Sequence, residues 1–157
     1  MRLSLLAFLA AGAAAPVTAT DTSSAQDALA AWEADPTQVF DAADIDLEVF
    51  RWIARPIVVF ADTPADPRFR EQLELLGERP GELTERDVIV IVDSAPAERS
   101  EVRKKLRPRG FMMALIGKDG GVKLRKPFPW DIRELSRSID KMPMRQEEVR
   151  ARREGLE

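Results

Sequence analysis

The sequence predicts an α/β fold with a mixed four-stranded sheet flanked by helices. Two continuous apolar runs, Ile57–Ala61 and Val88–Val92, are typical of strands that are buried on both faces of a sheet. The stretch between them has helical periodicity, so the two strands are expected to be parallel and joined by a right-handed crossover. A glycine-rich turn at residues 117–121 predicts an antiparallel hairpin later in the chain.

Residues 20–51, ahead of the first strand, carry a weaker pattern. Residues 20–30 are rich in Ser, Thr, Ala and Asp and are expected to form a flexible N-terminus. A short helix is predicted to begin at about Ala28 and to end at Asp35-Pro36. Scattered large apolar residues then follow up to Ile53, and we interpret them as an irregular arm that packs on the core. The alternative, an exposed binding segment, would leave many large apolar groups in water.

The helix between the two apolar strands has clear start and stop signals. Asp66 is a suitable N-cap and Pro67 suits the first helical position. Phe69, Leu73 and Leu76 then recur at the spacing of one helical face. The remaining elements are expected to be a short charged helix, two strands and a final helix, over residues 100–106, 111–116, 122–125 and 130–139. Within the hairpin, Lys118 and Asp119 are predicted to lie at the tip of the turn.

The element order is therefore β-α-β-α-β-β-α. We expect the sheet order 2-1-3-4, counting only these four strands, with the third strand antiparallel to the first. A short βαβ unit closed by a hairpin and a covering helix is the core arrangement of thioredoxin-like folds. After this core, residues 149–157 are predicted to form a charged, solvated C-terminal tail.

The first 19 residues have the pattern of an export signal. Arg2 is their only charge, and an almost unbroken apolar run from Leu3 to Ala15 follows it. This run is too short to span a bilayer, and Val17-Thr18-Ala19 suits a peptidase that cuts after Ala19. The alternative, a buried N-terminal helix, lacks the polar face such a helix needs. We therefore expect a periplasmic or secreted protein with no transmembrane segment after signal removal.

The composition excludes several classes of chemistry. The chain has no Cys, no His and no Tyr, so thiol nucleophiles, imidazole bases, Cys/His zinc sites and the usual haem ligands are absent. We expect no cofactor and no metal. The formal net charge of −3 and the lack of a basic stripe disfavour nucleic-acid binding.

One weak candidate site lies at the expected sheet edge. Asp62 and Asp93 each follow a doubly buried strand, and the carboxyl ends of parallel strands are where open α/β sheets bind ligands. Thr63 adjoins Asp62, and an antiparallel third strand would bring Arg109 to the same edge. Two carboxylates there could hold Mg²⁺ or Ca²⁺ or share a proton. The local alternative is that both are loop or cap residues while Asp66 caps the helix.

Three segments resemble a specific family. Residues 52–60 (WIARPIVVF), 115–123 (LIGKDGGVK) and 139–145 (IDKMPMR) are similar to the domain-of-unknown-function family 4174, a peroxiredoxin-like module also found in some secreted vertebrate matrix proteins. The resemblance covers residues 52–148 and implies a thioredoxin-like domain over that range and an exported setting. It implies no settled activity. Arg145, inside the last motif, could cap the preceding helix, pair with an acidic residue on the arm, or contact a ligand.

The chain departs from redox enzymes of this fold at the position that matters for their chemistry. Such enzymes place Cys-x-x-Cys or Thr-x-x-Cys just after the first core strand, where this chain has Asp62-Thr63-Pro64-Ala65. They also place a cis-proline before the third core strand, where this chain has Arg109-Gly110-Phe111. We therefore expect a non-catalytic module that binds an unknown protein or small-molecule ligand. The alternative is a divalent-cation or small-ligand site at Asp62 and Asp93, with cysteine-independent activity.

Overall fold

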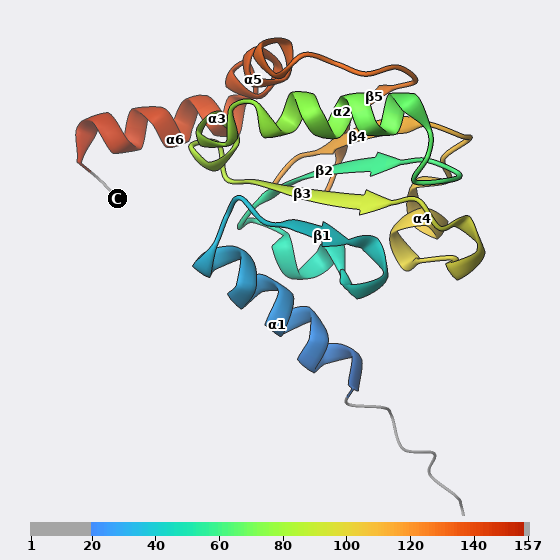
Figure 1. Cartoon of the computed structure of the whole chain (residues 1–157). Coiled ribbons are helices and arrows are strands. Elements are labelled where there is room, and N and C mark those ends of the chain that lie inside the picture. Colours follow the sequence, from blue (N-terminus) through green and yellow to red (C-terminus); the bar gives the residue numbers. More distant parts are fainter. Residues whose placement is uncertain (1–19, 156–157) are drawn as a thin grey trace, which may run out of the picture.

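A five-stranded mixed sheet forms the centre of the protein (Figure 1). The structure is a computed structural model that describes residues 20–155, so the predicted signal peptide at 1–19 and the last two residues of the tail lie outside it. The strand order is β1-β3-β2-β4-β5. The strands are β1 (Val39–Asp41), β2 (Arg55–Phe60), β3 (Val88–Asp93), β4 (Met112–Ile116) and β5 (Val122–Lys126).

The predicted topology is confirmed for four of these strands. β2 and β3 are parallel neighbours, and β4 is antiparallel to both β2 and β5, so the expected order 2-1-3-4 is found as β3-β2-β4-β5. The hairpin between β4 and β5 turns at Gly120, whose φ of +81° favours glycine. The Gly120 N–H donates to Gly117 O at 2.9 Å and closes the turn.

The sheet has a fifth strand that the sequence did not predict. β1 pairs in parallel with β3, and Val39 lies opposite Val90 in the register. The arm that contains β1 does pack on the core, as expected, since Phe40, Ile45 and Phe50 are buried. The arm is not irregular throughout, however, because β1 is a strand. The open edge of β3 offers backbone hydrogen-bond partners to an extended segment that lies beside it. Two 3₁₀ turns follow β1: η1 (Ala42–Asp44) and η2 (Leu47–Phe50).

The N-terminal segment is helical from Thr20, which corrects the expectation of a flexible segment over residues 20–30. Helix α1 (Thr20–Ala34) buries Ala28 and Trp32, four residues apart on one face. Trp32 Nε1 also donates to Val88 O at 3.3 Å, which fixes the end of the helix against β3. Packing of this face against the arm therefore selects the helix, although its polar composition gave little sign of one.

The other helices, apart from the last, pack on the two faces of the sheet and start largely where the sequence predicted. Asp66, Ser100 and Asp131 each accept a backbone hydrogen bond as N-caps. The helices are α2 (Pro67–Gly77), α3 (Pro80–Thr84), α4 (Glu101–Leu106), α5 (Ile132–Asp140) and α6 (Pro143–Glu154), with the 3₁₀ turn η3 (Pro96–Glu98) before α4. Among residues 20–155, no helix is long and apolar enough to cross a membrane.

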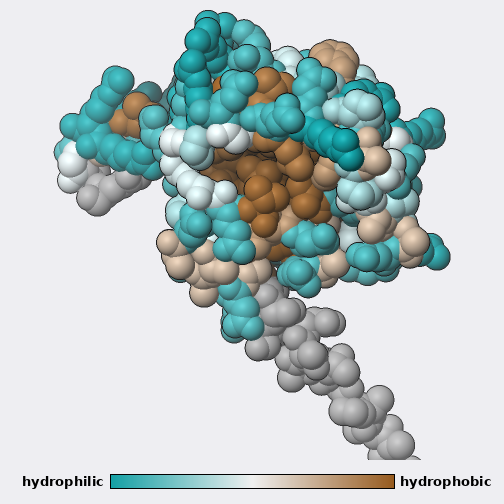
Figure 2. All heavy atoms as spheres, viewed as in Figure 1, coloured by the Kyte–Doolittle hydropathy of each residue, from teal (hydrophilic) through white to brown (hydrophobic). Residues whose placement is uncertain are grey.

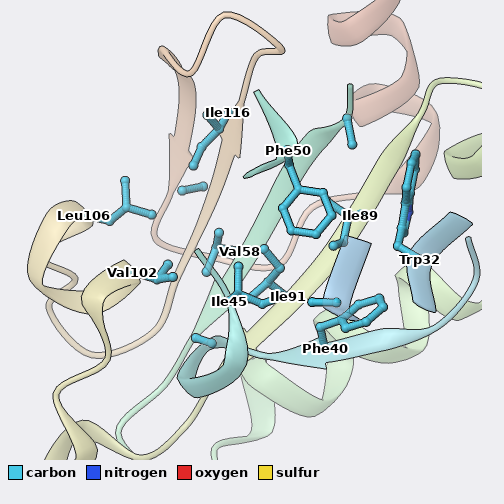
Figure 3. Close-up of a cluster of buried hydrophobic side chains, with 14 of the residues drawn as sticks. Trp32, Phe40, Ile45, Phe50, Val58, Ile89, Ile91, Val102, Leu106 and Ile116 are labelled. Atoms are coloured by element: carbon cyan, nitrogen blue, oxygen red, sulfur yellow. The ribbon is translucent and has the colours of Figure 1, made fainter. Parts of the chain in front are cut away.

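The apolar core lies in two layers, one on each side of the sheet. Figure 3 shows the first layer, where Trp32 from α1, Phe50 from η2 and Val102 from α4 surround the strand residues Val58 and Ile91. The rings of Trp32 and Phe50 meet edge to face at 6.4 Å. The second layer packs α2 and α5 onto the opposite side of β2 and β4.

This second side is covered incompletely at its outer edge. Figure 2 shows an apolar hollow over β1 and β3, below α2. On this side of the sheet Val39, which lies opposite Val90 of the second layer, is 49% exposed, and Val92 and Leu73, which pack against that layer, are only partly buried. The hollow forms because α2 lies over the middle of the sheet and no helix of the described chain covers β1 from this side.

Candidate functional site

The predicted carboxylates Asp62 and Asp93 do lie at one edge of the sheet, at the carboxyl ends of β2 and β3. Asp93 is the last residue of β3 and is buried, whereas the Asp62 side chain is 65% exposed. An arginine from α4 lies between them. Arg103 donates to Asp93 Oδ1 through Nη2 at 2.7 Å and through Nε at 2.9 Å, and its Nη1 is 3.9 Å from Asp62 Oδ1.

Arg103 closes this edge of the sheet. Its Nη2 also donates to the backbone oxygens of Ala61 at 2.8 Å and Asp93 at 3.0 Å, and its guanidinium lies over the Phe60 ring at 5.4 Å. The second carboxylate oxygen of Asp93 accepts from Ser100 Oγ at 2.6 Å. Both oxygens of the buried carboxylate are therefore already hydrogen-bonded, and a guanidinium lies directly against it.

The other predicted residues of this edge are peripheral. Thr63 is exposed, and its Oγ1 accepts from Ala65 N at 3.3 Å, a local turn contact. Arg109 is also exposed, and within residues 20–155 it pairs with neither carboxylate. Asp66 caps α2, as the local alternative proposed, by accepting from Arg68 N at 2.8 Å. No three carboxylates of the described chain gather as a set of metal ligands.

A second group of charged residues lies at the opposite end of the sheet, and sequence reasoning missed most of it. Arg55, the first residue of β2, is 1% exposed and donates to Glu148 Oε1 of α6 at 2.8 Å. Lys118 Nζ from the hairpin is 3.1 Å from the same oxygen and donates to Asp87 Oδ2 at 2.8 Å. Arg152 Nη2 is 3.7 Å from Asp87 Oδ2. We call these five residues, with Arg145 and its neighbour Asp140, the ion cluster.

Lys118 lies at the tip of the turn, as predicted, but its side chain is not a surface group. Its side chain is only 12% exposed and points into the ion cluster, while its backbone oxygen accepts from Trp52 N at 2.7 Å. Asp119 stays at the hairpin surface and pairs with Lys123 at 2.6 Å. The two neighbours differ because the side chains of adjacent turn residues point in different directions, and Lys118 is the one that faces Asp87 and Glu148.

Arg145 is buried at 2% exposure, and its partners are not on the N-terminal arm. Its Nη2 donates to Glu85 Oε1 at 3.1 Å, and its Nε is 3.5 Å from Asp140 Oδ1. Its Nη1 is 3.7 Å from Glu148 Oε2, beyond hydrogen-bond distance. Arg145 Nε and Nη1 and Glu148 Oε2 are therefore buried without a hydrogen-bond partner in the described protein. Arg145 also lines a surface groove of about 520 Å³ between α6 and Arg86.

Two carboxylates of the cluster, Glu148 and Asp140, have a lowered pKa. Burial raises the pKa of the Glu148 carboxyl, but hydrogen bonds from Arg55 and Lys118 outweigh burial and hold this pKa below its usual range. Burial also raises the pKa of Asp140, and the hydrogen bonds from Arg86 again lower it overall. Carboxylates held in the charged form by cations are poor proton carriers near neutral pH. The cluster is thus suited to holding segments together.

The three sequence motifs of the family resemblance meet in this cluster. Arg55 comes from the first motif, Lys118 from the second, and Asp140 and Arg145 from the third. Arg55 could have been singled out by one signal, a charged residue set among apolar ones at a strand end, whereas Lys118, between Gly117 and Asp119, carries no such signal. The sequence alone does not show that the motifs converge, because that depends on the sheet topology.

Comparison with solved structures gives the fold. Thioredoxin peroxidase I of Plasmodium yoelii matches with a TM-score of 0.50 and 14% identity, over 64% of this chain and 79% of that one. Plasmodium yoelii Prx1a, modified at its N-terminus into an artifactual octamer, gives the same TM-score and identity over 64% and 80%. The mitochondrial 2-cys peroxiredoxin of Plasmodium falciparum matches at 0.46 and 15%, over 61% and 79%. At this identity the likeness shows a thioredoxin-like fold alone.

Comparison with family models gives the family. No curated protein matches the chain. One family model, described as "Domain of unknown function (DUF4174)", matches residues 46–148. The matched span includes β2 to α5 and the part of α6 that carries Arg145 and Glu148, and it leaves α1 and β1 outside. Since it covers most of the chain, the protein belongs to this family, the domain of unknown function DUF4174.

Proposed function

We propose that the protein is an exported, non-catalytic thioredoxin-like module that works by binding, in the periplasm or outside the cell. One observation carries the non-catalytic part. At the strand end where redox enzymes of this fold place their thiol, the chain has Asp62-Thr63-Pro64, and Arg103 occupies the adjacent edge through Asp93 and Ala61 O. Without a thiolate, thiol–disulfide exchange and peroxide reduction have no nucleophile.

Turnover assays test this part directly. The protein spanning residues 20–157 is assayed for insulin reduction and for peroxide consumption, with a thiol enzyme of the same fold as the positive control. The expected result is a rate equal to that of buffer. A rate well above buffer would overturn the proposal, because it would require a nucleophile other than sulfur.

Export is supported by the apolar run that follows Arg2. Its test is a fusion of residues 1–25 to a reporter that is active only after export, compared with a fusion in which Leu5 and Leu6 are both replaced by Arg. The first fusion is expected to be active and the second inactive. Equal activity of the two fusions would refute the export signal.

The binding part is supported by the apolar hollow over β1 and β3. Exposed apolar patches on otherwise polar proteins often mark interaction sites. The test uses the mature protein as bait in an envelope fraction, with Val39→Lys in the hollow and Val122→Lys as a matched control on β5. Val122 is 41% exposed, close to the 49% of Val39, but lies on the opposite edge strand. A partner kept by V122K and lost by V39K is expected, and equal recovery by both would place binding elsewhere.

The cation hypothesis remains the second candidate, favoured by the convergence of Asp62 and Asp93 on one edge. A cation bound there would compete with Arg103, which already neutralises Asp93. Calorimetry with millimolar Mg²⁺ or Ca²⁺ on the wild type and on Asp62→Asn separates the two candidates. Heat of binding that disappears in D62N would favour the cation site, and no heat in the wild type would eliminate it.

A further inference from the structure

Helix α6 is attached to the rest of the protein mainly by charges. Its single buried residue is Arg145, and its apolar side chains Met144, Val149 and Ala151 are only partly buried. Within residues 20–155, neither layer of the apolar core contains a residue of α6. Figure 1 shows α6 at the side of the molecule, with its C-terminal half directed away from the sheet. The hydrophobic contribution to docking of this helix is therefore small.

Ion pairs supply the attachment. Glu148 joins α6 to β2 and to the hairpin through Arg55 and Lys118, at 2.8 and 3.1 Å. Arg145 joins it to Glu85 after α3 and to Asp140 at the end of α5. Further along the helix, Arg152 approaches Asp87 ahead of β3 at 3.7 Å. Glu148 is the centre of this set, because it meets two cations from the body and Arg145 from its own helix.

The negative charge of Glu148 compensates the positive charge of Arg55, which is buried next to it. Arg55 is almost fully buried beneath α6, and besides Glu148 it has Arg86 O at 2.9 Å and Asp87 at 3.9 Å. A neutral side chain at position 148 leaves the guanidinium of Arg55 buried with less compensation, which favours exposing it to water. Detachment of α6 achieves this exposure without disturbing either apolar layer.

We propose that α6 is a detachable latch, which releases as a unit from an intact sheet when Glu148 loses its charge. Release uncovers Arg55 and Lys118 and turns a closed, internally neutralised surface into a cationic one. This goes beyond the proposed binding role, since it assigns a two-state element to the C-terminal end of the family module. The matched family span ends at Glu148, so the residue that closes the latch is part of the module itself.

Acid is the natural trigger. The groups that face Glu148 are Arg55 from β2, Lys118 from the hairpin and Arg145 from α6, with Asp87 and Arg152 next to them. Burial raises the pKa of Glu148, but Arg55 and Lys118 outweigh burial and hold this pKa below its ordinary 4.5. The stabilisation is therefore complete above about 4.5 and is lost as the pH falls below that value.

Hydrogen exchange measured by mass spectrometry tests the latch on residues 20–157. A detached helix of this length does not persist in water, so release appears as faster exchange of the α6 amides. Glu148→Gln is compared with Glu147→Gln, which changes an exposed carboxylate one position earlier. At neutral pH, E148Q is expected to speed α6 exchange about 10- to 100-fold, the range for losing hydrogen bonds to a charged group. E147Q is expected to match the wild type.

Exchange in β2 and β3 decides between release and unfolding. The latch predicts unchanged exchange in both strands of E148Q, whereas equal acceleration of the strands and α6 would show global destabilisation and overturn the proposal. Unchanged α6 exchange in E148Q would also overturn it. Should E148Q fail to fold, the wild type is measured between pH 6 and 3 with correction for intrinsic rates. There α6 must lose protection at a higher pH than β3, and simultaneous loss refutes the latch.

Discussion

Replacing Arg103 with methionine tests the interpretation that an ion pair closes the carboxyl edge of the sheet. Methionine keeps an unbranched apolar stem, so packing beside Phe60 is largely retained while the guanidinium is removed. The change takes away both bonds to Asp93 Oδ1 and the bonds to two backbone oxygens, at 2.7 to 3.0 Å. Of the hydrogen bonds to the Asp93 carboxylate within residues 20–155, the one from Ser100 is kept.

The size of the effect follows from burial. Asp93 and Arg103 are only 4% and 11% exposed, so the variant leaves an uncompensated carboxylate inside the protein. Breaking such a pair from one side costs about 3–5 kcal/mol of the free energy of unfolding. The matched control is Arg137→Met, because Arg137 and Glu134 are as close, at 2.6 Å, but are 68% and 50% exposed. An exposed pair contributes about 0–1 kcal/mol to the free energy of unfolding. Because the two pairs have similar distances and differ in burial, comparing the two variants isolates the effect of burial.

Urea unfolding followed by tryptophan fluorescence measures both variants. R103M is expected to lower the midpoint strongly and to lower Tm by roughly 10 °C, while R137M stays close to the wild type. The double variant R103M/D93N should recover part of the loss, because an amide is cheaper to bury alone than a carboxylate. Equal losses of unfolding free energy in R103M and R137M would refute the argument. It would also be refuted if the loss in R103M/D93N equalled the sum of the losses in R103M and D93N.

Three further predictions concern stability. Burial raises the pKa of Asp140, but hydrogen bonds from Arg86 outweigh burial and lower this pKa from its ordinary 3.8. The resulting stabilisation is present above about pH 3.8 and is lost as the pH falls below that value. In D140N the free energy of unfolding should therefore depend less steeply on pH in this acidic range, which acid unfolding measures. Gly120→Ala should cost about 1–2 kcal/mol in urea unfolding because φ is +81°, and a neutral result would contradict the hairpin geometry. Phe50→Ala should cost about 3–5 kcal/mol because the ring is buried against Trp32, and a loss below about 1 kcal/mol would show that the arm packs loosely.

The central fold was predictable because its strands are encoded locally. Ile57–Ala61 and Val88–Val92 are apolar at every position, which is typical of a strand buried on both faces. The helix signals at Asp66-Pro67 and the turn glycines then fixed the connections. β1 escaped prediction because three residues, Val39–Asp41, are too few to show a period, and its strand character comes from pairing with β3.

The candidate site was predictable only in part. Strand ends locate Asp62 and Asp93 at one edge, and the structure confirms that placement. Arg103 was missed because an arginine in a short charged helix has the pattern of a solvated residue, and its burial depends on how α4 packs. The same applies to Lys118 and Glu148, whose partners are distant in the chain: Arg55 and Glu148 are 93 residues apart.

These long-range ion pairs perform, in a chain without cysteine, a task that disulfides often perform elsewhere. Arg55 with Glu148 and Arg86 with Asp140 join segments 93 and 54 residues apart and tie the C-terminal part of the chain to the centre. The physical consequences differ. A disulfide acts largely on the unfolded chain and is indifferent to pH, whereas an ion pair acts only in the folded state and ends when its carboxylate is protonated. A C-terminal helix held by such ion pairs can therefore detach when the carboxylates are protonated and dock again when they are charged. The same helix held by apolar packing would not respond to pH in this way.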